Sequence, residues 1–298
     1  MIHMKMDFHK LTLEDKEWVT KAFREEERMG CEFTFANNFL WGEQYQVQVA
    51  SCLGCLLIRF ARKGEIFYAF PCGKGDKKGA IEALIIHADG EGQKLELTGL
   101  MKEETELLER WFPEQFKFTT DRDVYDYIYN TQDLTLLAGK KYHGKRNHIA
   151  RFKDSDWSYE ILSQENMEEC HQMLLEWKER RGEYWNEDTQ IEFEVMQKAM
   201  NYFAELELEG GLIRQNGKVV GFCIGEPLTT DTYVVHFEKA FGEIQGAYPM
   251  INQQFVEHNC QDYAYVNREE DAGEEGLRKA KLSYRPAILL EKYHAYLH

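Results

Sequence analysis

The sequence predicts an α+β protein with two domains of similar plan. At 298 residues the chain suits two ordinary domains better than one, and its 43% hydrophobic residues are enough to build two cores. Each half predicts antiparallel strands first and alternating helices and strands later. We therefore expect each domain to hold a mixed, mostly antiparallel sheet flanked by helices.

The first half begins with a helix and a meander. Thr12 stands three residues before Asp15, as in a capping box, and the apolar residues from Trp18 to Phe23 recur at helical spacing. This helix is expected to end near Gly30. Strands are expected next at residues 45–50, 56–61 and 66–70. They are followed by a helix at 77–87, a strand at 94–98, a helix at 103–111 and a strand at 116–119.

The second half predicts a strand at residues 159–162 and helices at 166–181 and 192–208. Thr189 and Glu192 form the capping box expected for the second helix. Asn216-Gly217 joins strands at 211–215 and 218–226, because both residues accept the positive φ of a type I′ turn. The remaining expected elements are a strand at 233–240, a helix after Gly246, a strand at 263–266, a helix after Gly276 and a strand at 287–292.

A basic segment at residues 137–153 connects the two halves. It holds no acidic residue, although the chain has 52 acidic residues against 36 basic ones and a formal net charge of −16. Its cations are Lys140, Lys141, Lys145, Arg146, Arg151 and Lys153. Two interpretations stay open: a solvated linker helix, or a surface that holds a long polyanion such as coenzyme A or an RNA end. We expect domains at residues 1–136 and 154–298, with this segment between them.

The composition limits the class of protein. The acidic balance disfavours a protein that coats nucleic acid over its whole surface. No apolar run reaches the roughly 20 residues that span a bilayer, and residues 1–10 lack a signal-peptide core, so we expect a cytoplasmic protein without an integral membrane segment. Seven scattered cysteines, including Cys52 and Cys55 in an apolar strand, predict free structural thiols. The sequence shows no metal-site spacing, P-loop or Ser-His-Asp order, which disfavours metal and nucleophilic catalysis.

The clearest signal of a ligand site lies in residues 233–286. The strand YVVHFEKA leads through FGEIQG into a helix that opens at Ala247. Unpaired N–H groups and the helix dipole at such a start favour a phosphate or carboxylate. An acidic turn, NREEDAGEEG, then leads into the basic helix LRKAKLSYRP. We expect Gly242, Gly246, Ala247 and Tyr248 to bind the ligand.

Two candidate catalytic residues lie on the strand YVVHFEKA. His236 and Glu238 are two residues apart and project from one face, while Phe237 and Lys239 take the other. Either can accept a proton from an attacking amine if its pKa lies near neutrality. The alternative is a hydrogen-bonded structural His–Glu pair.

A third candidate catalytic residue lies on the basic helix. The apolar spacing from Leu277 to Tyr284 predicts a buried stripe with Lys281 at its edge. From there Lys281 can reach a donor phosphate or stabilise the oxyanion of an acyl transfer, with Arg278 and Lys279 as binding residues beside it. A solvated basic face is the alternative.

Three segments carry a family resemblance: LAGKKYHGKRNHIARF, GAYPMINQQF and DAGEEGLRKAKLSYRP. They resemble the family that includes the C-terminal domain of phosphatidylglycerol lysyltransferases, over nearly the whole chain. The element order is similar to a GNAT-type N-acyltransferase, and two copies resemble the tandem arrangement of Fem-type peptidyltransferases. The resemblance implies two tandem GNAT-like domains with a donor cleft in the second. In the lysyltransferases the donor is an aminoacyl-tRNA and the acceptor a membrane lipid.

Two departures from these families bear on the donor and the acceptor. The sequence shows no multi-span membrane region such as the lysyltransferases carry, which argues against a lipid acceptor. The turn GEIQGA, residues 242–247, only approximates the Q/R-x-x-G-x-G/A loop with which acetyltransferases hold pyrophosphate. Specificity for acetyl-CoA therefore does not follow.

The expected function is transfer of an acyl or aminoacyl group from acyl-CoA or aminoacyl-tRNA to an amine, with no tightly bound cofactor. The expected partners are a small-molecule or peptide amine acceptor and, for an aminoacyl donor, tRNA. Lys141, Lys145 and Arg146 are expected to bind the donor. Two alternatives stay open: a non-catalytic binding module that kept the fold, and an RNA-binding protein that uses residues 140–153.

Overall fold

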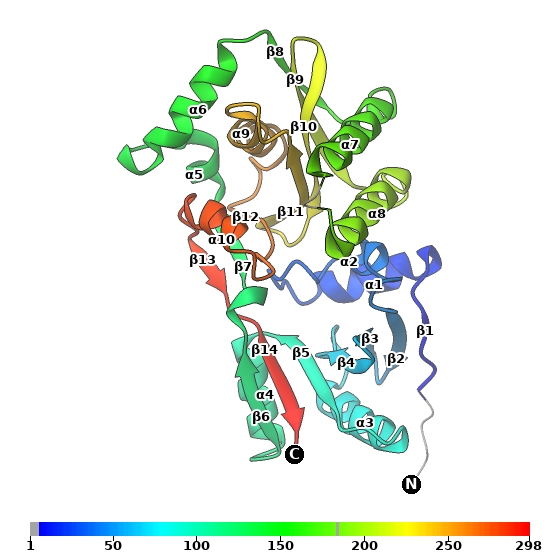
Figure 1. Ribbon diagram of the computed structural model, residues 1–298. Coiled ribbons are helices and arrows are strands. Elements are labelled where there is room, and N and C mark those ends of the chain that lie inside the picture. Colours follow the sequence, from blue (N-terminus) through cyan, green and yellow to red (C-terminus); the bar gives the residue numbers. More distant parts are fainter. Residues whose placement is uncertain (1–5, 183–184) are drawn as a thin grey trace. The chain divides into compact units, whose positions relative to one another are not determined.

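The computed structural model describes residues 6–182 and 185–298, in which the chain forms two compact units (Figure 1). Unit 1 comprises Met1–Asp126, Glu270–Glu275 and Leu289–His298, and unit 2 comprises Tyr127–Glu269 and Gly276–Ile288. Each unit holds one seven-stranded sheet, in which most neighbouring strands are antiparallel and which includes a parallel pair, β4–β5 in unit 1 and β11–β12 in unit 2. The predicted α+β class is confirmed.

The sheet of unit 1 has the order β1-β2-β3-β4-β5-β14-β6. Its strands are β1 (His9–Lys10), β2 (Gln48–Cys52), β3 (Cys55–Arg62), β4 (Glu65–Ala69), β5 (Glu96–Leu100), β6 (Phe116–Thr120) and β14 (Tyr293–Leu297). Its helices are α1 (Lys16–Arg24), α2 (Phe35–Leu40), α3 (Lys77–Gly90) and α4 (Lys102–Trp111), with short 3₁₀ turns η1 (Leu13–Asp15) and η2 (Arg122–Val124).

The sheet of unit 2 has the order β13-β7-β12-β11-β10-β9-β8. Its strands are β7 (Asp126–Asn130), β8 (Trp157–Ile161), β9 (Glu209–Gln215), β10 (Lys218–Pro227), β11 (Thr232–Ala240), β12 (Tyr265–Asn267) and β13 (Ile288–Leu290). Its helices are α5 (Thr131–Leu136), η3 (Lys140–Tyr142), α6 (His143–Lys153), α7 (Met167–Arg181), α8 (Glu187–Asn201), α9 (Ala247–Asn259) and α10 (Glu275–Leu282).

Local sequence signals explain several of these boundaries. Asp15 accepts a hydrogen bond from the backbone N–H of Thr12 at 2.9 Å, as expected. The turn at Asn216-Gly217 has the predicted positive φ values of 52° and 78°. The expected capping box at Thr189 is wrong, because Asn186 caps α8 instead and accepts from the N–H of Thr189 at 2.9 Å.

Each half of the sequence contributes a strand to the sheet built mainly from the other half, which the sequence did not indicate. β14 pairs with both β5 and β6 in unit 1, whereas β7 pairs with β12 in unit 2. The structure therefore divides the chain differently from the expected domains of 1–136 and 154–298. Helix α6, the expected connector, belongs to unit 2, and the last strand belongs to unit 1. β1, α2, β7, α5 and β14 were not predicted.

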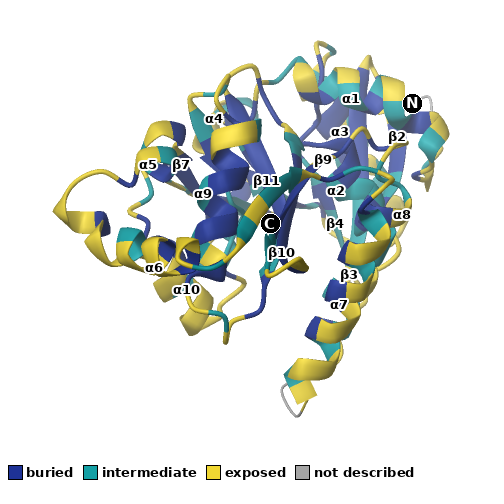
Figure 2. Ribbon diagram, turned by 90° about the horizontal axis from the view of Figure 1, so that it is seen from above, coloured by how far each residue is buried: buried dark blue, intermediate teal, exposed yellow. Residues whose placement is uncertain are grey.

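Helices cover both faces of the sheet in unit 2. Glu238 of β11 contacts α9 through Asn252, while the next residue, Lys239, donates to Glu192 of α8 at 2.7 Å. Adjacent residues of a strand point to opposite faces, so α9 lies on one face and α8 on the other. Most residues of α9 are buried and most of α6 are exposed (Figure 2). α9 is thus a mostly buried helix that packs against one face of the sheet at β11.

Unit 1 contains a buried cluster of charged groups. Lys292 Nζ donates to Asp126 Oδ1 and to Glu32 Oε2, each at 2.7 Å. Ligand atoms of Cys31, Glu32 and Asp126 lie within 4.8 Å of one another. The lysine ammonium already supplies the positive charge there, so this cluster needs no bound cation. All seven cysteines are free and buried, which agrees with the expected free thiols.

Candidate functional site

The parallel strands β11 and β12 part within the sheet of unit 2. They pair only where residues 232–234 lie opposite 265–267, and β11 then continues to Ala240. On the other edge of β11 the register with β10 shifts so that His236 is an extra residue. Such a β-bulge re-aims side chains and often lies beside an active site. The polar side chains around this parting form the candidate site.

His236 is held between two carboxylates. Its Nδ1 lies 2.8 Å from Glu269 Oε1 and its Nε2 lies 2.9 Å from Glu226 Oε1, with 2% of the side chain exposed. Burial alone would lower the pKa of His236, but the hydrogen bonds to Glu226 and Glu269 raise it to about 10. The imidazole therefore carries its proton at neutral pH. This geometry does not support the expected role of His236 as a proton acceptor.

Glu238 is held by two neighbours of its own. Arg268 Nη2 donates to both oxygens of Glu238, at 2.9 and 3.0 Å, and Asn252 Nδ2 donates to Oε2 at 2.8 Å. Arg268 Nη1 and Asn252 Oδ1 have no hydrogen-bond partner, although both atoms are buried. Leaving such groups unpaired costs roughly 1 to 3 kcal/mol each. A ligand that pairs with them must first displace a neighbouring side chain.

Lys145 reaches the same group of residues from α6. Its Nζ lies 3.8 Å from the centroid of the Tyr284 ring. Burial and the nearby charge of Arg268 lower the pKa of Lys145 to about 8, although Glu238 opposes them. Arg146 instead donates to the carbonyl oxygens of Leu137 and Gly139. Of the three connector residues expected at the donor, Lys145 is thus the one that this structure brings to the site.

The other expected connector residue, Lys141, pairs with Asp133 at 3.5 Å. It is exposed on the outer surface of the segment, as are Lys140, Arg151 and Lys153. These cations line the outside of the helix that carries Lys145. Binding of a polyanion by these exposed cations stays a prediction.

Lys281 is buried, with 8% of the residue exposed. Its Nζ donates to the carbonyl oxygens of Arg268 at 2.7 Å and Glu269 at 3.2 Å, just after β12. Leu277 is 39% exposed, so the expected buried stripe is wrong: the lysine stem turns inward because its ammonium holds these two carbonyls. Arg278 is half-buried and Lys279 is exposed on α10.

The loop before α9 is partly covered. Gly246 has φ +86°, and a Cβ on it would lie 2.2 Å from the carbonyl oxygen of His148 in α6. Ala247 is fully buried behind it, whereas Gly242 is exposed and Tyr248 is 36% exposed. The expected anion-binding start of α9 therefore has α6 packed against one side. Its role in binding stays a prediction.

The corresponding loop of unit 1 holds a carboxylate of the protein itself. Glu26 Oε1 accepts from the N–H of Gly73 at 2.7 Å, and Glu26 also pairs with Lys77 and Arg28. Asp76 caps α3 by accepting from the N–H of Gly79 at 3.0 Å. These side chains take the place of an external anion, which favours unit 2 over unit 1 as the unit that holds the ligand.

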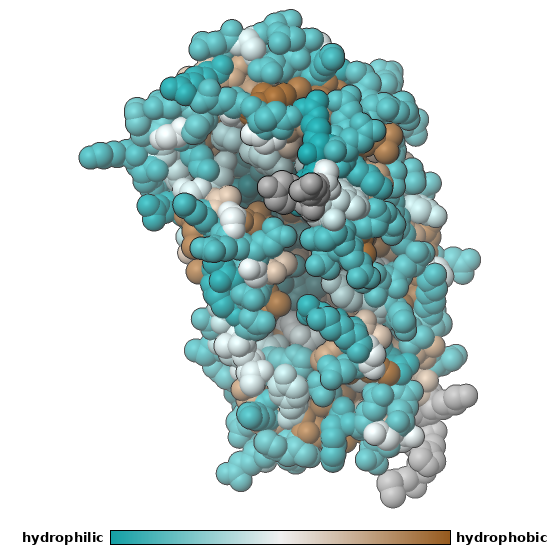
Figure 3. All heavy atoms as spheres, viewed as in Figure 1, coloured by the Kyte–Doolittle hydropathy of each residue, from teal (hydrophilic) through white to brown (hydrophobic). Residues whose placement is uncertain are grey.

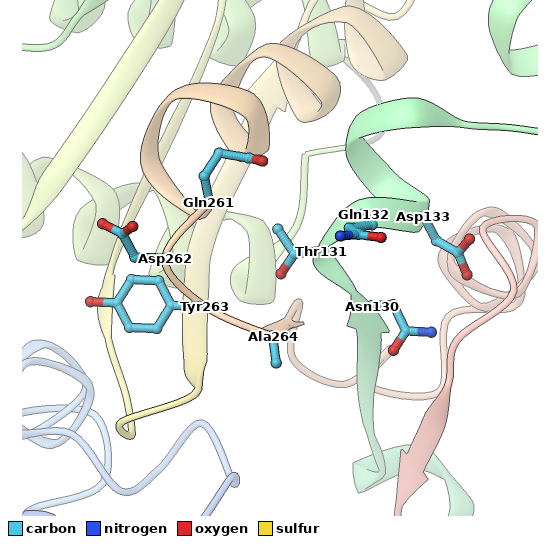
Figure 4. Close-up of a pocket in the computed structure, with 8 residues that line it drawn as sticks. All are labelled: Asn130, Thr131, Gln132, Asp133, Gln261, Asp262, Tyr263 and Ala264. Atoms are coloured by element: carbon cyan, nitrogen blue, oxygen red, sulfur yellow. The ribbon is translucent and has the colours of Figure 1, made fainter.

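A pocket of about 500 Å³ lies elsewhere in unit 2, where β7 meets α5 and α9 leads to β12 (Figure 4). Thr131 Oγ1 has no hydrogen-bond partner there, but it is shielded from solvent. Asp262 and Tyr263 point away from Asn130 and Asp133 in Figure 4. Because these polar groups do not converge on one point, we assign no ligand to this pocket.

Sequence reasoning missed two residues of the site, Asn252 and Arg268. Both lie inside segments that it singled out: Asn252 in GAYPMINQQF and Arg268 in the acidic turn NREEDAGEEG. A single arginine among so many acids was a usable signal, since a buried carboxylate on the neighbouring strand needs a counter-charge. Asn252 gave no signal of its own, because polar residues on a helix are usually exposed.

Comparisons with known proteins give a family and a fold. The family described as phosphatidylglycerol lysyltransferase, C-terminal, matches residues 23–296. A conserved protein of unknown function from Bacteroides thetaiotaomicron VPI-5482 is 38% identical, covers 99% of this chain and 100% of its own, and superposes with a TM-score of 0.94.

None of the helices in the described part of the chain is both long and apolar enough to cross a membrane. The face in Figure 3 is mostly hydrophilic.

More distant relatives support the fold. L-PGS from Bacillus licheniformis is 19% identical over 94% of this chain and 91% of its own, with a TM-score of 0.65. FemX is 9% identical over 98% of each chain, with a TM-score of 0.62. An uncharacterized protein of Mycoplasmoides gallisepticum is 20% identical over 176 residues, which are 56% of this chain but only 54% of that relative. The tandem GNAT-like fold expected from the sequence is confirmed.

Proposed function

The chain belongs to the phosphatidylglycerol lysyltransferase C-terminal family, and from this premise we propose that unit 2 transfers an aminoacyl group from aminoacyl-tRNA to an amine. The observation that carries the proposal is a pair of buried polar atoms beside Glu238 that have no hydrogen-bond partner in the described part of the chain. Asn252 Oδ1 lacks a donor and Arg268 Nη1 lacks an acceptor, and both atoms are buried at the parting of β11 and β12.

An aminoacyl group can form hydrogen bonds with both of these atoms, whereas an acetyl group can form a hydrogen bond with only one. The α-ammonium of an aminoacyl ester donates to Asn252 Oδ1, and its carbonyl oxygen accepts from Arg268 Nη1. When the acceptor amine attacks the carbonyl carbon, that oxygen becomes negative, and a well-placed donor is worth roughly 3 kcal/mol there. The carbon–nitrogen bond forms, the ester carbon–oxygen bond breaks, and the tRNA hydroxyl leaves with a proton. Holding amine and ester together supplies much of the remaining rate enhancement.

Two further features favour a tRNA-linked donor over a CoA thioester. Lys140, Arg151 and Lys153 are exposed on or next to the helix that carries Lys145, so the backbone of an RNA can run along the outside while its acylated end enters. The start of α9, where an acetyltransferase would hold pyrophosphate, has the His148 carbonyl packed against Gly246.

The test is an aminoacyl-transfer assay with tRNA charged with each labelled amino acid and a panel of small amines and peptides. We expect Asn252→Leu to lower kcat/KM at least tenfold, because it removes the acceptor for the α-ammonium. Gln253→Leu is the matched control, since its amide bonds to the carbonyl of Thr135 away from the site. Transfer only from acyl-CoA, or equal rates in both variants, would contradict the proposal.

A non-catalytic binding module is the second candidate, and one observation favours it. His236 and Glu238 are both fully engaged by protein partners, as expected if the fold kept a ligand and lost the reaction. This candidate predicts that charged tRNA binds while its ester survives unchanged in the presence of every amine. Loss of the ester only when both protein and amine are present selects the transferase.

A further inference from the structure

The attacking amine must lose a proton, and three side chains expected near the donor are engaged elsewhere. His236 already carries its proton between Glu226 and Glu269. Glu238 is paired with Arg268 through both oxygens. Lys281 Nζ donates to the backbone carbonyls of Arg268 and Glu269. A proton acceptor for the reaction has to come from another element.

Within the described residues, the side chain of Lys145 is not held by any hydrogen bond or ion pair that a proton acceptor would have to break. Among residues 6–182 and 185–298 its ammonium has neither a hydrogen bond nor an ion pair, and its Nζ lies 3.8 Å from the centroid of the Tyr284 ring. The residue is half-buried, at the edge of the site and on the helix whose outer side carries the exposed cations. Its long stem can swing without breaking any hydrogen bond or ion pair.

We propose that Lys145 is the proton acceptor of the transfer reaction, a role that rests on the function proposed above. Its neutral Nζ takes a proton from the acceptor ammonium, whose nitrogen lone pair then attacks the ester carbon. The carbon–nitrogen bond forms and the ester carbon–oxygen bond breaks. The Lys145 ammonium returns its proton to the departing tRNA oxygen, and the second proton that the nitrogen loses on becoming an amide passes to solvent water, so atoms and charges balance over one turnover.

The groups that face Lys145 explain why it can be neutral. Burial comes first, followed by the positive charge of Arg268 after β12, and together they lower its pKa to about 8. Glu238 of β11 acts in the opposite sense. Tyr284, which follows α10, presents its ring, and Asn252 of α9 bonds to Glu238. A pKa near the working pH is what an efficient general base requires.

The first test needs no substrate. Trace labelling with an isotopic amine-reactive anhydride across pH 6 to 11, read by peptide mass spectrometry, reports the titration of each lysine. We expect Lys145 to label with a midpoint near pH 8, and exposed Lys218 of β10 serves as the internal reference for the labelling reaction. In Arg268→Gln the Lys145 midpoint should rise, because a neighbouring cation is gone. A Lys145 midpoint at or above 10 in the wild type overturns the proposal.

The second test uses the aminoacyl-transfer assay. Lys145→Arg keeps the charge and the ring contact but cannot give up its proton. We expect at least a hundredfold loss in kcat, a donor KM within threefold of wild type, and loss of the limb of the pH profile near 8. Lys218→Arg is the matched control and should match wild type. Retained turnover in Lys145→Arg overturns the role of Lys145 alone, whereas a wild type without turnover overturns the proposed function as well.

Discussion

Replacing His236 with glutamine should destabilise unit 2 in a strongly pH-dependent way. The imidazolium bonds to Glu226 and Glu269 at 2.9 and 2.8 Å in a buried setting. Its folded pKa of about 10 lies above the unfolded value of 6.5, so its contribution to stability is fully present below pH 6.5 and is lost as pH rises to about 10.

The magnitude follows from the two pKa values. A tenfold change in protonation is worth about 1.4 kcal/mol, so the difference between 6.5 and about 10 corresponds to at most about 5 kcal/mol at low pH. At pH 7 about 4 kcal/mol of this remains. His236→Gln also leaves two carboxylates facing each other without a counter-charge, which agrees with the roughly 3 to 5 kcal/mol typical of a broken buried ion pair.

The assay is urea denaturation followed by tryptophan fluorescence at pH 6, 7, 8, 9 and 10. The stability gap between wild type and His236→Gln should shrink by about 1.4 kcal/mol per pH unit above 6.5 and nearly vanish at pH 10. His171→Gln, a half-buried helix position, serves as the matched control. A gap below about 1 kcal/mol at pH 7, or one that stays constant with pH, would refute the ion-pair account of His236.

Two further substitutions pair an informative change with a control. Lys281→Met should lower the free energy of unfolding by about 2 kcal/mol, because two backbone carbonyls lose a charged donor. The control Lys279→Met, at an exposed position, should change it little. Equal urea midpoints for the two variants would contradict this. Gly246→Ala should cost about 3 kcal/mol in thermal unfolding, because its Cβ meets the His148 carbonyl at positive φ, whereas Gly242→Ala, with no atom within 4 Å, should be nearly neutral. Similar melting temperatures in the two glycine variants would contradict this, because they would mean that α6 shifts away from the added Cβ at little cost.

The elements that the sequence predicted best are those with local signals. The Asn216-Gly217 turn depends only on two residues that accept positive φ, so it was predicted correctly. The exchange of β7 and β14 depends on pairing with β12 and β5, far away in the chain, and no local pattern reports such pairing. The start of α8 was missed because Asn186 and Thr189 are both good caps, and only tertiary context selects between them.

For the site, the sequence indicated the right strand and helix but not the chemistry of each residue. The alternation on β11 identified His236 and Glu238, yet their partners determine what they can do. Glu269 lies beyond β12, so nothing near His236 in the sequence showed that its imidazole would stay protonated. Lys145 was expected to bind the donor because it lies in a basic segment, whereas its burial beside Arg268 gives it a different chemistry.

The central claim is that unit 2 recognises an aminoacyl group on tRNA, and calorimetric binding tests it most directly. Charged tRNA, the same tRNA without its amino acid, and acetyl-CoA are titrated into the wild type and into Asn252→Leu. We predict that charged tRNA binds at least tenfold more tightly than uncharged tRNA, that Asn252→Leu removes this difference, and that acetyl-CoA does not bind. Equal affinity for charged and uncharged tRNA in the wild type, or tight binding of acetyl-CoA, would contradict the claim.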